Sequence, residues 1–144
     1  MELAIDELKA VTVILRASQA ILEVIRKDVA KYGLNPTEFS VLELLYHKGD
    51  QPIQKIGENV LISSSSITYV VDKLEQKNYV LRKGCPEDRR VTYATLTNAG
   101  RRFMDEVFPQ HKLIISRIFE DIEVTGVHET IALLKRIGHK AGTQ

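Results

Sequence analysis

The amino-acid sequence predicts a mainly α-helical protein with one small β-hairpin. Long segments near both ends repeat apolar residues at three- and four-residue spacing, which is typical of helices. Between them lie three shorter helical patterns and then two strand-like segments around a turn-rich loop. Three short helices followed by a hairpin are typical of a winged helix-turn-helix. We therefore expect one domain over residues 1–144, with a winged helix-turn-helix over 35–97 between helices at 3–31 and 98–140.

The positive charge of the chain is concentrated in its middle. The whole sequence has a net charge of +1, with 44% apolar and 27% charged residues, which are ordinary values for a globular domain. Residues 63–102 contain 8 basic and 4 acidic side chains, whereas the segments before and after them are net negative. A local basic region of this kind favours a polyanionic partner.

The predicted terminal helices carry more apolar surface than a surface helix needs. The first one, at roughly 25 residues and 1.5 Å per residue, is about 38 Å long. One interpretation is that it is buried in the core of its own chain, and the other is that a second subunit shares it. Its main apolar stripe consists of Leu8, Val11, Leu15, Leu22, Ile25 and Val29. In the last helix we expect Val127, Ile131, Leu134 and Ile137 to face inward.

Residues that favour the beginning or the end of a helix occur in the central region. Gly33 is suited to end the first helix in the left-handed conformation, and Asn35 with Pro36 is suited to start the next. A short helix is expected from Pro52 to Asn59. Asn78 is expected to take a left-handed conformation after the third helix, because asparagine tolerates that region.

The stretch from Ser63 to Lys77 is the predicted third helix, with Ser63 as its N-cap. One face is apolar, and the other carries hydroxyls, a phenol and a cation. The side chains of that second face are too polar for a hydrophobic core, and they are suited to bind DNA phosphates and base edges. The alternative interpretation is a helix face that is simply exposed to solvent. The apolar face consists of Ile67, Val70, Val71 and Leu74. The expected DNA contacts are Ser64, Ser65, Ser66, Thr68, Tyr69 and Lys73.

The two strands are predicted at Val80–Lys83 and Val91–Leu96, and the basic loop between them forms the wing. Arg90 is suited to the minor groove, where a long cation reads width and negative potential. Asp88 is placed to orient Arg90 by a charge-assisted bond. An exposed turn with a surface ion pair is the alternative interpretation. The remaining wing cations, expected on phosphates, are Arg82, Lys83 and Arg89.

This order of elements resembles the multiple-antibiotic-resistance regulator (MarR) family over nearly the whole chain. The most specific residues are Asp88-Arg89-Arg90 on the wing and Leu96-Thr97-Asn98-Ala99-Gly100 after it. The stretches Ser63–Leu74 and Pro36–Leu42 also fit the family. The family usually has glycine where Leu61 and Asn78 stand here. Two stretches, 34–51 and 66–75, look like the subgroup that responds to quinones and phenols.

The resemblance implies a homodimer in which the terminal helices of two subunits interlock, bound to a pseudo-palindromic double-stranded DNA operator. It also implies repression that a small aromatic ligand, phenolic or quinone-like, relieves. Ordinary packing is the alternative for the residues that we expect around that ligand by place and type. They are Arg16, Phe39, Tyr46, His47, Phe108 and His111.

Other functions have weaker support in the sequence. Cys85, the single cysteine, lies beside Arg82 and Lys83, which favour thiolate, so a thiol-based redox regulator is one alternative. A protein-interaction module on a winged-helix fold, without DNA binding, is another. The sequence has no nucleophile motif, phosphate loop or paired metal ligands, so we expect no enzyme, metal or cofactor. Without a signal peptide or membrane span, the expected location is the cytoplasm.

Overall fold

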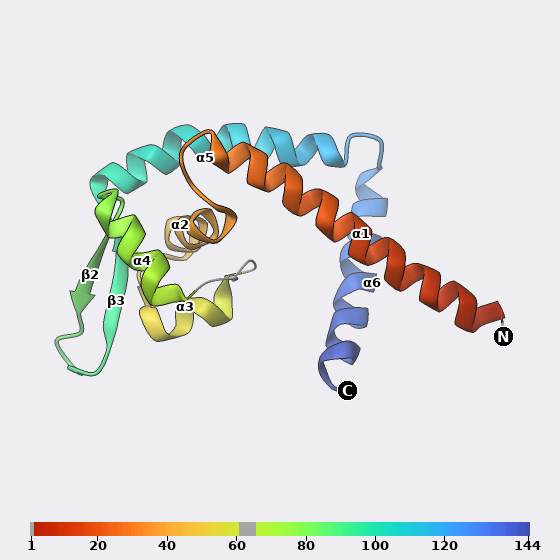
Figure 1. Ribbon diagram of the computed structural model, residues 1–144, viewed down its shortest axis with the longest axis horizontal. Coiled ribbons are helices and arrows are strands. Elements are labelled where there is room, and N and C mark those ends of the chain that lie inside the picture. Colours follow the sequence, from red (N-terminus) through yellow and green to blue (C-terminus); the bar gives the residue numbers. More distant parts are fainter. Residues whose placement is uncertain (1, 61–65) are drawn as a thin grey trace. The chain divides into compact units, whose positions relative to one another are not determined.

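The computed structural model describes residues 2–60 and 66–144, and it confirms the mainly helical fold with one small sheet (Figure 1). The predicted contacts Ser64 and Ser65, the family position Leu61 and the predicted cap Ser63 lie outside the described residues. The elements in chain order are α1 (Glu2–Ala30), α2 (Pro36–Lys48), β1 (Gln51–Pro52), α3 (Ile53–Asn59), α4 (Ile67–Gln76), β2 (Val80–Gly84), β3 (Thr92–Leu96), α5 (Asn98–Ile118) and α6 (Val124–Gly142).

The sheet is antiparallel, with β3 in the centre between β1 and β2. The hairpin pairs Val80 with Leu96 at its base and Gly84 with Thr92 at its far end. Both strands agree with the prediction to within one residue. The strand β1 was not predicted, because its two residues, paired with β3, are too short to show an alternating pattern.

Local sequence signals set several of the helix ends. Asn35 caps α2 in a full capping box: its side chain accepts from the Glu38 backbone N–H at 2.8 Å, and Glu38 accepts from the Asn35 N–H at 2.8 Å. Gly33 has φ +75° and Asn78 has φ +65°, so the predicted left-handed positions are confirmed. The Thr97 hydroxyl accepts from the Gly100 N–H at 2.9 Å at the start of α5.

The start of α4 differs from the prediction. The helix begins at Ile67, and Ser66 occupies the cap position without a side-chain hydrogen bond. The prediction of a helix capped by Ser63 is therefore wrong. A run of four serines offers several equivalent caps, and the sequence alone does not select among them.

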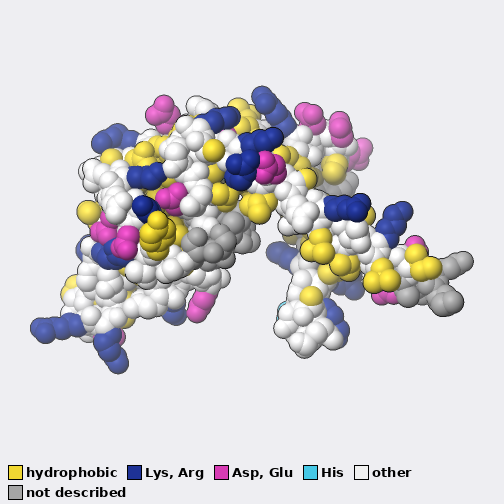
Figure 2. Space-filling model, in the orientation of Figure 1, with side chains coloured by type: hydrophobic (Ala, Val, Ile, Leu, Met, Phe, Trp, Pro, Cys, Tyr) yellow, Lys and Arg dark blue, Asp and Glu magenta, His cyan; other side chains and the backbone are white. Residues whose placement is uncertain are grey.

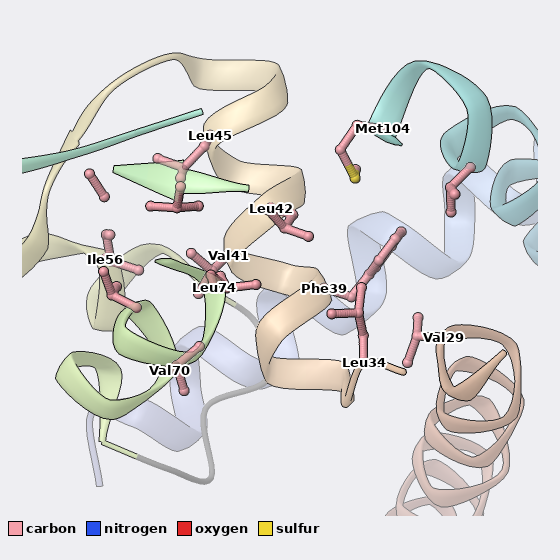
Figure 3. Close-up of a cluster of buried hydrophobic side chains, with 14 residues drawn as sticks. Val29, Leu34, Phe39, Val41, Leu42, Leu45, Ile56, Val70, Leu74 and Met104 are labelled. Atoms are coloured by element: carbon pink, nitrogen blue, oxygen red, sulfur yellow. The ribbon is translucent and has the colours of Figure 1, made fainter. Parts of the chain in front are cut away.

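The hydrophobic core lies around α2, which contributes Phe39, Val41, Leu42 and Leu45 (Figure 3). Figure 3 shows side chains from the neighbouring elements pointing toward this helix. Phe39, Leu42 and Leu45 are at most 1% exposed, so this face of the helix is fully committed to the core. The core residues from other elements include Val29 of α1, Ile56 of α3, Val70, Val71 and Leu74 of α4, Val80 and Ala94 of the hairpin, and Met104 of α5.

The chain divides into two compact units, Met1–Pro109 and Gln110–Gln144. In the first unit only the end of the α1 stripe is buried: Val29 is fully buried, whereas Leu8 is 70% and Leu15 is 58% exposed. In the second unit, Ile131, Leu134 and Ile137 of α6 are each more than two-fifths exposed. The expectation that these α6 residues face inward is therefore wrong for the single chain.

Candidate nucleic-acid interface

The helix α4 has one buried face and one polar face, as predicted. Val70, Val71 and Leu74 are buried in the core. On the other side Thr68 and Tyr69 are exposed, and the Lys73 Nζ lies 5.3 Å from the centre of the Tyr69 ring. This cation–π contact holds a phenol and a positive charge together on the helix surface. Ser66, directly before the helix, is also exposed.

The tip of the hairpin carries an organised pair of charged residues. Asp88 Oδ1 accepts from the Arg90 backbone N–H at 3.0 Å and from its Nε at 3.2 Å. The Arg90 side chain is still 90% exposed, and Figure 2 shows Lys and Arg side chains projecting from the tip. The hydrogen bonds from Arg90 lower the pKa of Asp88. Arg89 and Lys83 are exposed nearby.

A side-chain hydrogen bond connects the helix α3 to the loop of the wing. The Gln54 Nε2 donates to the Arg90 carbonyl oxygen at 3.1 Å. This bond connects α3 to the loop 36 residues later in the chain. Sequence reasoning did not identify Gln54, because no periodic pattern relates two positions that meet only after the sheet has formed.

Arg82 differs from the other wing cations. Its Nη1 donates to Glu75 Oε1, and its Nη2 lies 2.7 Å from Asp72 Oδ1. Its side chain is 28% exposed. The structure thus places this predicted phosphate contact in an ion-pair cluster between β2 and α4.

Cys85 is a free, half-buried cysteine directly after β2. Its backbone N–H donates to the Val91 carbonyl oxygen at 3.1 Å, so the residue helps to close the hairpin loop. Chemical modification of the thiol would therefore alter the structure of the hairpin loop where it leaves β2.

Three of the six predicted ligand residues lie together. His47 packs edge-on against Phe108 with ring centres 4.7 Å apart, and Tyr46 lies 5.2 Å from His47. The Tyr46 hydroxyl donates to Asp105 Oδ1 at 2.6 Å, a partner that the sequence analysis missed. This hydrogen bond raises the pKa of Tyr46.

The other three predicted ligand residues differ in exposure. Phe39 is 1% exposed and belongs to the core, and Arg16 is exposed on α1. His111 is buried, and it belongs to the second unit. The hollow beside His47 has a volume of about 180 Å³, less than the roughly 300–1,000 Å³ of most ligand pockets.

Two features are absent from the described part of the structure: a group of metal-ligand side chains and a helix able to span a membrane. Over residues 2–60 and 66–144, no three acidic, histidine or cysteine side chains are grouped so that they could bind a metal ion. Within the same ranges, no helix has the length and apolar character that a membrane span requires.

The helix-turn-helix, the polar face of α4 and the basic hairpin together define a winged helix-turn-helix protein. Solved structures agree with this fold. AbsC from Streptomyces coelicolor, a MarR-family transcriptional regulator, superposes with a TM-score of 0.85 at 25% identity, over 96% of each chain. Sco3205 from the same organism, solved in complex with DNA, has a TM-score of 0.83 at 18% identity, over 94% of this chain and 87% of that one.

Sequence comparison gives the family. Residues 34–92 match the MarR family. The regulator MhqR from Bacillus subtilis is 48% identical over 134 residues, which are 93% of this chain and 92% of that protein. The chain therefore belongs to the MarR family and is a transcriptional regulator, not an enzyme.

Proposed function

We propose that the protein is a homodimeric, sequence-specific DNA-binding repressor that a small phenolic or quinone-like molecule releases from its operator. The observation that carries the proposal is the exposed polar face of α4 next to an Arg90 that Asp88 holds outward from the wing. A helix of this kind fits the major groove, and an arginine at a wing tip fits the adjacent minor groove. The structure of Sco3205 with DNA and the MarR family membership support this assignment.

The contacts divide into two classes. Thr68 and Tyr69 have side chains suited to base edges, as hydroxyls bond to bases and an aromatic ring packs on the thymine methyl group. Lys73, Lys83 and Arg89 are suited to phosphates, which position the protein without reading sequence. Ser64, Ser65 and Ser66 belong to the proposed interface by their place directly before α4.

The terminal helices supply the proposed dimer contact. Leu8 and Leu15 of α1 and Leu133 and Ile137 of α6 are about half exposed or more in the single chain. Apolar surface of this extent favours a protein partner. A second copy of the chain would cover it and place two recognition surfaces about one helical turn apart on a pseudo-palindrome.

The ligand response is proposed for the aromatic cluster of Tyr46, His47 and Phe108. These rings connect α2 to α5, the helix that follows the winged helix-turn-helix. A small aromatic molecule that packs among them would shift α2 relative to α5 and favour a form with lower operator affinity. The resemblance of residues 34–51 and 66–75 to the subgroup that responds to quinones and phenols supports a ligand of this type.

A mobility shift with duplex DNA tests the proposal. The wild-type protein should select a pseudo-palindromic duplex from a randomised pool at moderate salt, and 2-hydroxybenzoate or a simple benzoquinone should weaken that complex. A protein that retains no duplex would favour the protein-interaction module instead. A Cys85→Ser variant distinguishes release by a bound aromatic ligand from release by modification of the Cys85 thiol. If the wild-type protein responds to the quinone and Cys85→Ser does not, thiol modification is favoured.

A further inference from the structure

Arg82 joins the wing to the helix α4 instead of facing solvent. Its guanidinium donates to Glu75 Oε1 and to the Thr68 carbonyl oxygen at 3.3 Å, and it pairs with Asp72. Thr68, Asp72 and Glu75 are four and three residues apart, so they lie along one side of α4 on successive turns. A single planar side chain from β2 therefore spans two turns of the helix.

The same cluster also holds the backbone of β2. The Arg82 N–H donates to Glu75 Oε2 at 3.4 Å, so both carboxylate oxygens of Glu75 are used by one residue. Arg82 and Glu75 side chains are 28% and 31% exposed. A lysine cannot reproduce this arrangement, because it lacks the fixed fork that binds two acceptors at once.

A phosphate contact through Nη1 and Nη2 of Arg82, the nitrogens that now bind Glu75, Asp72 and Thr68, would compete with these bonds. The cluster holds two acids on the helix that we propose enters the major groove, and Arg82 supplies the positive charge beside them. A released guanidinium would leave Asp72 and Glu75 unpaired close to the DNA backbone, where negative charges repel phosphates. Arg90, in contrast, is 90% exposed.

We propose that Arg82 is a positioning residue that fixes the wing relative to α4, so that the helix and the wing reach adjacent grooves at the same time, and that it does not bind phosphate itself. This inference rests on the proposed DNA-binding function. Its physical basis is preorganisation: two contact elements on a rigid frame bind together without a further loss of conformational freedom.

A double-mutant cycle tests the inference. The probe is the duplex that the wild-type protein selects from a randomised pool, and the variants are Arg82→Gln, Glu75→Gln and the two combined. Each single substitution should weaken binding about tenfold, equivalent to about 1.4 kcal/mol, and the double variant should be no weaker than Arg82→Gln. If Glu75→Gln binds as well as wild type or more tightly, Arg82 is a phosphate ligand restrained by acids and the inference is wrong.

Lys83→Gln is the matched control. It removes the same charge from the next position of the same strand, and in the described part of the chain Lys83 has no ion-pair partner. Its effect should add to that of Glu75→Gln without coupling. It should also reduce the dependence of log affinity on log salt by about 0.9, the amount expected for one phosphate contact.

Hydroxyl-radical footprinting separates positioning from general destabilisation. Arg82→Gln and Arg82→Lys should lose protection where the wing lies while keeping the protection given by α4. A protein that is only partly folded would lose both in parallel, and that result would overturn the inference. Failure of the wild-type protein to select any duplex would instead overturn the proposed function.

Discussion

Arg90 and Asp88 show how much of the proposed site depends on single side chains. Asp88 accepts from both the backbone and the side chain of Arg90, so the carboxylate sets the direction of an otherwise long and flexible cation. A surface ion pair of this kind contributes little to folding, because solvent screens the attraction between the two charges. Its effect should therefore appear in DNA binding and not in stability.

We expect Arg90→Ala to weaken operator binding by about tenfold or more while leaving the unfolding midpoint in urea nearly unchanged. The reason is the loss of a minor-groove cation, which an equally exposed alanine cannot replace. Fluorescence anisotropy with the selected duplex measures the first quantity. Asp88→Asn should show a smaller loss, because Arg90 stays present but is less well oriented. Wild-type affinity in Arg90→Ala would remove the wing tip from the interface.

Tyr46 gives a pH prediction. Its pKa is raised because its hydroxyl donates to the Asp105 carboxylate, with burial and the charge of Asp105 adding to the effect. The protonated phenol is the form that the fold stabilises. This contribution is therefore fully present below the unfolded pKa of about 10, and it is lost as pH rises through the higher folded pKa.

Tyr46→Phe should accordingly be less stable than wild type at neutral pH, and the difference should shrink in alkaline solution. Urea denaturation between about pH 7 and pH 11 measures it. The control is Tyr69→Phe, which removes the hydroxyl of an exposed tyrosine and should leave the free energy of unfolding at neutral pH nearly unchanged. A Tyr46→Phe difference that stays constant into alkali would argue against the Asp105 bond.

At the scale of elements, the turn after α4 depends on one residue. Asn78 has φ +65°, and the Thr97 hydroxyl donates to its carbonyl oxygen at 2.7 Å. This turn directs the chain from α4 into β2 and so sets where the wing begins. Asparagine and glycine accept the left-handed region, whereas alanine loses about 1–2 kcal/mol there.

We expect Asn78→Ala to lower the free energy of unfolding by about 1 kcal/mol, and Asn78→Gly to leave it nearly unchanged. Urea titrations of both variants give the two values. Equal losses in the two variants would indicate that the Asn78 side chain matters for another reason than its backbone conformation.

At the scale of the whole molecule, the apolar residues of α1 and α6 are the main unexplained surface. Leu8, Leu15 and Leu133 are each more than half exposed in the single chain. If two chains bind one operator, DNA affinity depends on their association, because the second half-site is then bound intramolecularly.

Leu15→Asp should convert the proposed dimer to a monomer in sedimentation experiments and weaken operator binding by about a hundredfold or more. Leu81→Asp is the matched control, since Leu81 is a similarly exposed leucine (52%) on β2, a strand of the wing. It should leave the sedimentation coefficient unchanged. A wild-type protein that sediments as a monomer at micromolar concentration would contradict the dimer proposal directly.

The order of the elements, the buried face of α4 and the caps at Gly33, Asn35 and Asn78 follow from the sequence itself. Each depends on residues close together in the chain, where spacing and backbone preference act directly. Only the tertiary structure decided that Arg82 pairs with acids of α4, that Gln54 holds the wing, and that Tyr46 bonds to Asp105. These contacts join residues that become neighbours through packing, so no local pattern predicts them.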